Sequence, residues 1–104
     1  MSITTILNTA FSGLRANAQQ ANASANNIVN QNTPGYRPVT ANGVSPVAGG
    51  AGAGVQAQLL AQDGPVDVTR EFTKVIVAET AYKANAQVIR AADQLADETV
   101  DLIG

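Results

Sequence analysis

The chain of 104 residues contains no cysteine, no histidine and no tryptophan, and the first two absences each remove a class of chemistry. Without cysteine the chain can form neither disulfide bridges nor thiolate metal sites, and without histidine the usual zinc sites cannot be built. The same two absences exclude the common pairs of nucleophile and general base. We therefore predict no enzymatic activity, no cofactor, no metal and no small-molecule substrate.

Charged residues are scarce, at 13%, and they are unevenly placed. Residues 1–62 contain two arginines and no acidic residue, whereas residues 63–104 contain eight acidic and four basic residues. Nucleic-acid binding requires a clustered basic patch, so no nucleic-acid partner is expected. Asp93, Asp97 and Asp101 recur every four residues. We interpret them as a solvated helix face rather than as a cation site, because magnesium and calcium sites usually draw ligands from several elements.

Long apolar runs are also missing. No stretch approaches the roughly 18 apolar residues that a membrane span requires, so no transmembrane segment is predicted. The first residues lack the basic and long apolar regions of a cleaved secretory signal peptide. Aromatic residues make up 4% of the chain, and much of its 45% hydrophobic content is alanine. Because a small, alanine-rich domain buries little surface, an isolated copy is expected to be marginally stable.

Apolar residues recur in steps of three and four near both ends of the chain, which predicts two amphipathic helices. The first helix is expected over residues 3–30, and the second over residues 68–103 with Asp67 as its N-cap. Gly13 costs roughly 1 kcal/mol inside a helix and indicates a close helix contact or a bend. The segments are therefore residues 1–33 for an N-terminal helical part, 34–66 for a turn and flexible linker, and 67–104 for a C-terminal helical part.

The middle segment is rich in glycine and proline, which is typical of a flexible linker. Pro34 and Gly35 suit the central pair of a type II turn, followed by Tyr36. Residues 55–61 alternate in part and form a possible short strand. The expected fold is mainly α, with the terminal helices paired as an antiparallel coiled-coil hairpin and joined by a middle with at most a short β element.

Large side chains on the two helical stripes are predicted to pair the helices. They are Leu7, Phe11, Leu14, Ile28, Phe72, Val75, Tyr82 and Ile89. The C-terminal helix carries a second apolar stripe beside the first. Its members are Val77, Ala81, Ala84, Val88, Leu95 and Leu102. A helix that is apolar on two sides requires neighbours on two sides, so this pattern indicates an assembly.

Asparagine is concentrated near the N-terminus, where eight of the nine lie within the first 42 positions. Capping of a helix end explains Asn30 or Asn32, but not the crowding between positions 26 and 32. We predict that Asn26, Asn27, Asn30 and Asn85 form hydrogen bonds between packed subunits, since a buried amide without a partner costs about 1–3 kcal/mol. Capping alone is the alternative interpretation.

Two stretches of the chain resemble the flagellar basal-body rod and hook proteins. The N-terminal stretch comprises Ser12-Gly13-Leu14 and the run ANNIVNQNTPGY at residues 25–36. The C-terminal stretch comprises VDVTREF at residues 66–72 and AYKANAQVI at residues 81–89. The two stretches occur in the order, and at the ends, in which this family carries them.

The resemblance implies a short structural subunit of the bacterial flagellar rod. In this family the terminal helices pair as a coiled coil, and copies polymerise with other rod and hook subunits into the torque-transmitting shaft of the basal body. Subunits are exported through the flagellar type III export apparatus without a cleaved signal peptide. The alternative is a soluble helical-hairpin adaptor or assembly regulator related to these proteins, which would be a well-folded monomer or dimer.

Overall fold

The computed structural model describes residues 3–44 and 54–103, with side chains up to residue 98. It contains two long helices and a pair of strands. In chain order these are α1 (Ile3–Val29), β1 (Val39–Val44), β2 (Gln56–Ala61) and α2 (Val68–Ile103). The molecule is elongated, with extents of 63 × 27 × 14 Å. The mainly helical fold with two long terminal helices is therefore confirmed.

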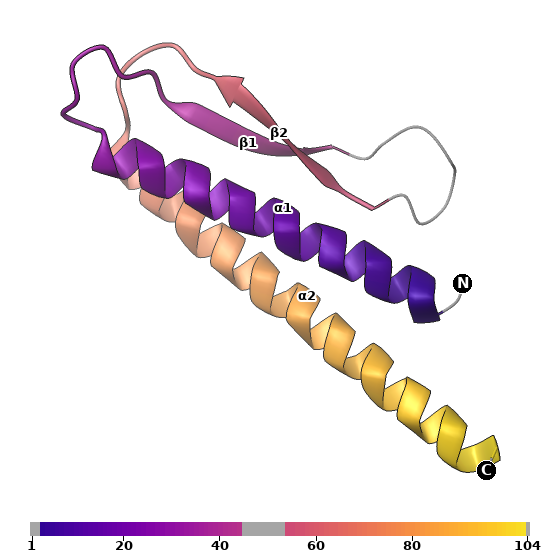
Figure 1. Ribbon diagram of the computed structural model, residues 1–104. Helices are drawn as coiled ribbons and strands as arrows, with labels where there is room; N and C mark the ends of the chain where they lie inside the picture. The colour runs from indigo at the N-terminus through magenta and orange to yellow at the C-terminus, as the bar shows by residue number, and fades with distance from the viewer. Residues whose placement is uncertain (1–2, 45–53, 104) are drawn as a thin grey trace.

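The helices α1 and α2 lie side by side and run in opposite directions (Figure 1). Gly13, in the first half of α1, faces Asn85 in the middle of α2. Ser24, near the end of α1, lines a groove together with Lys74, near the start of α2. Because α2 is longer, its C-terminal part continues beyond the first residues of α1 (Figure 1).

The strands β1 and β2 form an antiparallel pair, with partners running from Val39↔Ala61 to Val44↔Gln56. The strand β2 falls within the predicted strand at residues 55–61. The residues of β1 fall in the segment predicted to be a turn and flexible linker, so this strand is a difference from the prediction. Asn42 and Gly43 have low intrinsic strand propensity, so β1 forms because α1 and β2 supply partners for it. The other linker residues, 45–53, lie outside the described part of the chain.

The hairpin is attached to α1 at two points, and the first is Ser12. Its Oγ accepts a hydrogen bond from the Val55 N–H at 2.9 Å, just before β2, and donates one to the Thr9 carbonyl at 2.7 Å. Gly54 has φ +77° and packs directly against the Ser12 side chain, so a Cβ there would collide with it. The entry to β2 is thereby held on α1.

The second attachment is Asn27, which is fully buried. Its Nδ2 donates to the Val39 carbonyl at 2.8 Å, and its Oδ1 accepts from the Val39 N–H at 3.0 Å and from the Tyr36 hydroxyl at 2.7 Å. The side-chain amide thus pairs with the backbone of Val39 at the start of β1. These bonds explain the burial of Asn27 within one copy, and its contact with another subunit stays a prediction.

The chain reaches β1 through a tight turn after α1. The Tyr36 N–H donates to the Thr33 carbonyl at 3.2 Å, and Gly35, with φ +75°, follows Pro34 at the centre of the turn. This is the geometry of a type II turn, which requires a positive φ at its third position. The turn directs the Tyr36 hydroxyl back to the end of α1.

The interior of the described chain is built from small side chains. The buried hydrophobic residues are all alanines: Ala10, Ala16 and Ala23 of α1, Ala41 of β1, and Ala78 and Ala92 of α2. A Cβ placed on Gly13 would stand only 2.8 Å from the Asn85 Nδ2. The helices therefore approach closely at this position, and Gly13 marks a helix contact.

We predict that Asn27→Leu will detach the hairpin from α1. Leucine has a similar volume but cannot form the hydrogen bonds to the Tyr36 hydroxyl and to the backbone N–H and carbonyl of Val39. Losing these partners should lower the free energy of unfolding by about 2–4 kcal/mol. Urea unfolding and amide hydrogen exchange at Val39 measure the effect. Asn26→Leu is the matched control, since Asn26 is exposed. Equal exchange protection in both variants would contradict this role.

A second prediction concerns the close contact at Gly13. Gly13→Ala should stabilise α1 by about 1 kcal/mol through helix propensity, but in the native chain the new methyl group must displace Asn85. In an Asn85→Ala background that obstacle is absent, so the full gain should appear. A double-mutant cycle from thermal unfolding measures the coupling. Strictly additive effects would show that Gly13 and Asn85 do not constrain each other.

Candidate interaction surface

The large hydrophobic side chains remain partly or largely exposed in the single chain. Exposed fractions range from 40% for Val44 to 80% for Val29. On α2 this group includes Phe72, Ile76, Val77, Tyr82, Val88 and Leu95. Soluble single-chain proteins usually cover most such residues on each helix, so this surface is a candidate for contacts with other chains.

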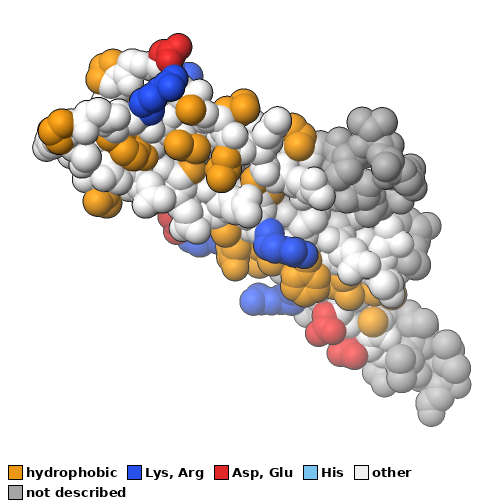
Figure 2. All heavy atoms as spheres, turned by 45° about the horizontal axis from the view of Figure 1, so that its top comes forward, with side chains coloured by type: hydrophobic (Ala, Val, Ile, Leu, Met, Phe, Trp, Pro, Cys, Tyr) orange, Lys and Arg blue, Asp and Glu red, His pale blue; other side chains and the backbone are white. Residues whose placement is uncertain are grey.

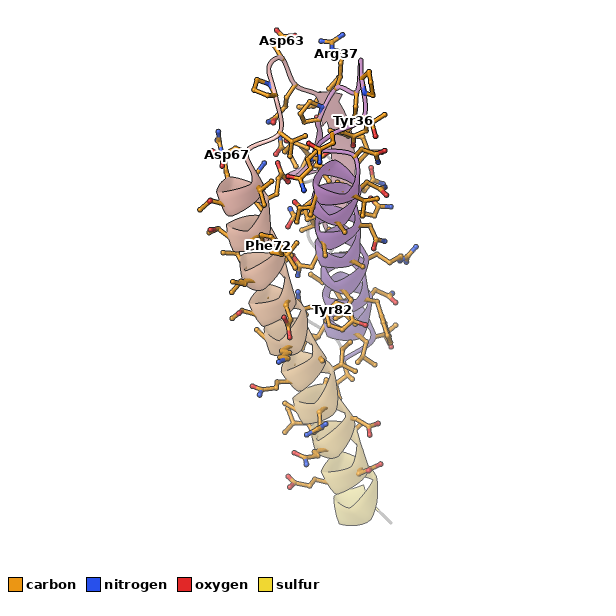
Figure 3. The ribbon with its side chains drawn as sticks, turned by 90° about the vertical axis from the view of Figure 1, so that its left-hand side faces the viewer. Tyr36, Arg37, Asp63, Asp67, Phe72 and Tyr82 are labelled. Atoms are coloured by element: carbon orange, nitrogen blue, oxygen red, sulfur yellow. The ribbon has the colours of Figure 1, made fainter. Side chains whose placement is uncertain are left out.

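The residues predicted to pair the helices lie at the margins of the α1–α2 contact. Leu7, Leu14, Ile28, Val75 and Ile89 are half-buried, whereas Phe11, Phe72 and Tyr82 are exposed. Tyr82 lines a shared groove of about 880 Å³ with Phe11 and Leu14 of α1, so these three are brought together. Tyr82 extends from the middle of α2 toward α1 (Figure 3). The fully buried hydrophobic residues of the two helices are alanines instead, and Gly13 lies directly against Asn85. Which of the eight residues contributes to helix pairing stays a prediction.

The second apolar stripe of α2 is left open by the rest of the chain. Val77 is 61% exposed, Val88 45% and Leu95 56%, and Ala84 between them is also exposed. Ala81 is half-buried, and the Leu102 side chain lies outside the described residues. Burial of such a stripe by a neighbour would contribute roughly 25 cal/mol for each Å² removed from water. The stripe is thus an unused source of binding free energy.

The asparagines predicted to contact other subunits have different surroundings. Asn30 caps the end of α1, because its Nδ2 donates to the Asn26 carbonyl at 2.9 Å and its Oδ1 accepts from the Thr33 hydroxyl at 3.2 Å. Asn85 is half-buried against Gly13, and the Asn26 side chain is exposed. Asn27 is internal, as described above. Contacts with other subunits stay a prediction for Asn26, Asn27, Asn30 and Asn85.

Charged side chains form three ion pairs within the described chain. Arg37 and Asp63 meet at 2.7 Å on the exposed outer end of the hairpin (Figure 3), and Lys83 and Glu79 at 3.2 Å on the surface of α2. Both pairs are solvent-exposed, so each contributes little to stability. The third pair joins Lys74 to the buried Glu71 at 3.6 Å.

Glu71 is a buried polar residue of α2 that the sequence does not single out. It is 3% exposed, and its Oε2 has no hydrogen-bond partner among the described residues. Lys74 continues from Glu71 to the Thr40 hydroxyl of β1 at 3.4 Å. Lys74 thereby links the buried Glu71 to the hairpin.

Ser12 was also not assigned a role from the sequence beyond its place in the resemblance. The signal that could have identified it is its position next to Gly13. Successive residues of a helix point in different directions. Ser12 therefore bonds to the hairpin at Val55, while Gly13 lies against Asn85 of α2.

The described residues contain neither a cluster suited to a metal ion nor a helix suited to a membrane. Among these residues, no three cysteine, histidine, aspartate or glutamate side chains are gathered as a metal site would require. In the same residues, neither helix combines the length and the apolar content needed to cross a bilayer.

Comparisons with known proteins match both helical ends. A family model described as flagella basal body rod protein matches residues 7–37, which contain both attachments of the hairpin on α1 and the turn. A model described as flagellar basal body rod FlgEFG protein C-terminal matches residues 65–102, which contain almost all of α2.

The chain is also similar to the flagellar hook protein FlgE of Caulobacter vibrioides (strain ATCC 19089 / CIP 103742 / CB 15), with 32% identity over 84 residues. The match covers 77% of this chain and 14% of the hook protein, so the chain spans a small part of that relative's length. Two family models match the two helical ends, and the hook protein matches most of this chain. The chain therefore belongs to the family of flagellar rod and hook proteins.

Proposed function

We propose that this chain is a structural subunit of the flagellar rod. It polymerises through its terminal helices, with copies of itself and with other rod and hook subunits, into the shaft of the basal body that transmits torque. Its role is mechanical, and no catalysis is assigned to it. It reaches its place through the flagellar type III export apparatus, without a cleaved signal peptide.

The observation that carries this proposal is that small hydrophobic side chains are buried while many large ones are exposed. Alanines occupy the interior of the described chain, while large hydrophobic side chains lie at its surface. Burying a methylene-sized group contributes about 0.8 kcal/mol, so the single chain gains little from its own core. Neighbouring copies that cover Val88 and Leu95 would add the missing stabilisation.

In the assembled rod, α1 and α2 pack as an antiparallel coiled coil. Leu7, Phe11, Leu14 and Ile28 of α1 pair with Phe72, Val75, Tyr82 and Ile89 of α2 at the margins of the alanine contact. The exposed Asn26 and the half-buried Asn85 form polar contacts with neighbouring subunits. Family membership and the antiparallel helices support this arrangement.

The alternative is a soluble helical-hairpin adaptor or assembly regulator. The observation in its favour is the intrachain attachment of the hairpin by Ser12 and Asn27, which gives one copy a defined tertiary structure. Such a protein would unfold sharply as a monomer or dimer, and its mass would not increase further with concentration.

We predict that Val88→Glu will block assembly without unfolding α2. The new carboxylate lies on the second stripe, where burial against a neighbour would require it to lose its hydration. Gln87→Glu is the matched control, because it adds the same charge at the next exposed position beside the stripe. Sedimentation velocity and circular dichroism over a concentration series measure mass and helicity.

The native chain and Gln87→Glu should gain both mass and helicity as concentration rises, whereas Val88→Glu should gain neither. A native chain that stays a sharply folded monomer or dimer would favour the adaptor. Detection of the tagged chain in purified basal bodies tests the proposed location, and its absence there would refute it.

A further inference from the structure

The exposed side of α2 carries opposite charges at its two ends. Arg70 is exposed at the start of the helix, and Glu98 is exposed near its end. Neither side chain takes part in the ion pairs found in the described chain. Between them lie the exposed apolar residues Val77, Val88 and Leu95. The two positions are four heptads apart, so on a straight helix their directions differ by roughly 80°.

Arg70 lies on a groove between β1 and α2. This groove has a volume of about 390 Å³, with Ser24 of α1, Ala41 of β1 and Val77 of α2 among its lining residues. Its two basic side chains are Arg70 and Lys74. The groove therefore offers an apolar strip with a positive border.

The acidic groups near the groove leave the Arg70 guanidinium available. Glu71 is buried and faces Lys74 at 3.6 Å. Asp67 caps the helix by accepting a hydrogen bond from the Arg70 backbone N–H at 3.2 Å. Both carboxylates thus have local roles.

The other end of the molecule is acidic. Asp93, Asp97 and Glu98 are exposed, and no basic residue follows Arg90 in the sequence. This part of α2 extends beyond the start of α1 (Figure 1), so α1 does not cover it. Figure 2 shows acidic side chains close to this end of α2, with hydrophobic side chains exposed on the same face.

We propose that the acidic end of α2 from one copy seats in the basic groove of the next copy. Glu98 then lies opposite Arg70. The inference rests on the proposed function, because it names the contact through which copies follow one another. A second copy is the fitting occupant since the groove and the complementary end occur on the same chain.

The contact is heterologous, because it joins two different surfaces of the same molecule. Each copy that binds leaves one groove and one acidic end free, so the contact propagates instead of closing. Successive copies are displaced along α2 by the separation of Arg70 and Glu98, roughly 42 Å at about 1.5 Å per helical residue. All copies point in the same direction, which gives the assembly polarity.

Charge reversal tests the contact. Arg70→Glu places an acid near the start of α2 and Glu98→Arg a base near its end, and both changes suit the helix dipole, so both variants should remain folded. Each alone should raise the concentration required for assembly by about tenfold or more, because attraction becomes repulsion. Arg90→Glu is the control, since Arg90 is an exposed arginine of α2 that does not line the groove.

The decisive sample is an equimolar mixture of the Arg70→Glu and Glu98→Arg variants. In the mixture every groove can meet an end of opposite charge, so assembly should return although neither variant assembles alone. Light scattering and sedimentation velocity at low salt measure this, with circular dichroism as a check of folding. Raised salt should weaken assembly of the native chain by screening the pair.

The outcomes separate this inference from the proposed function. A native chain that never assembles would overturn the proposed function and this contact with it. Assembly of the native chain together with unimpaired single variants, or a mixture that stays dissociated, would overturn the contact alone. Closed dimers of the native chain would also overturn it, because a heterologous contact of this kind does not close at two copies.

Discussion

The close approach of α1 and α2 is the constraint on which the rest of the structure depends. Alanine lines the contact, and at Gly13 even a Cβ would stand within 2.8 Å of Asn85. Small side chains permit this separation, but they bury little apolar area per residue. The large hydrophobic side chains are covered only in part by the single chain, and the exposed ones remain available to a neighbour.

Polar groups compensate for the thin core by fixing one arrangement of the chain. Asn27 makes three hydrogen bonds to Tyr36 and Val39, and Ser12 holds the backbone at Val55. A buried amide is stable only where its partners are correctly placed, so these contacts select a single register of the hairpin on α1. A two-stranded hairpin is marginal in water by itself, and α1 supplies the support that it lacks.

Stability and assembly are consequently linked in this molecule. A chain with a well-filled core would expose fewer large side chains and would have less to gain from neighbours. Here the exposed stripe of α2 and the opposite charges of Arg70 and Glu98 lie on the elongated flank of a molecule 63 Å long. Apolar burial would supply most of the binding free energy, while the charges would select orientation and register. This division of roles suits a mechanical subunit of the flagellar rod.

The local sequence determined the elements that depend on short-range chemistry. The apolar period of three and four residues predicts α1 and α2 almost to their ends. The family resemblance of residues 12–14, 25–36, 66–72 and 81–89 agrees with the family matches. The two helices depend on hydrogen bonds and side-chain spacing within a few residues, and this spacing can be read directly from the sequence.

The tertiary structure decided everything that depends on separation in space. Strand β1 was not expected, because its support comes from β2 and α1 rather than from its own propensity. The sequence predicts subunit contacts for Asn27, and only the folded chain shows that its amide bonds to Val39 and Tyr36. The apolar period indicates stripes of large residues, but the hydrophobic side chains that one copy buries fully are alanines, because a small side chain is covered completely by a thin contact whereas a large one is covered only in part.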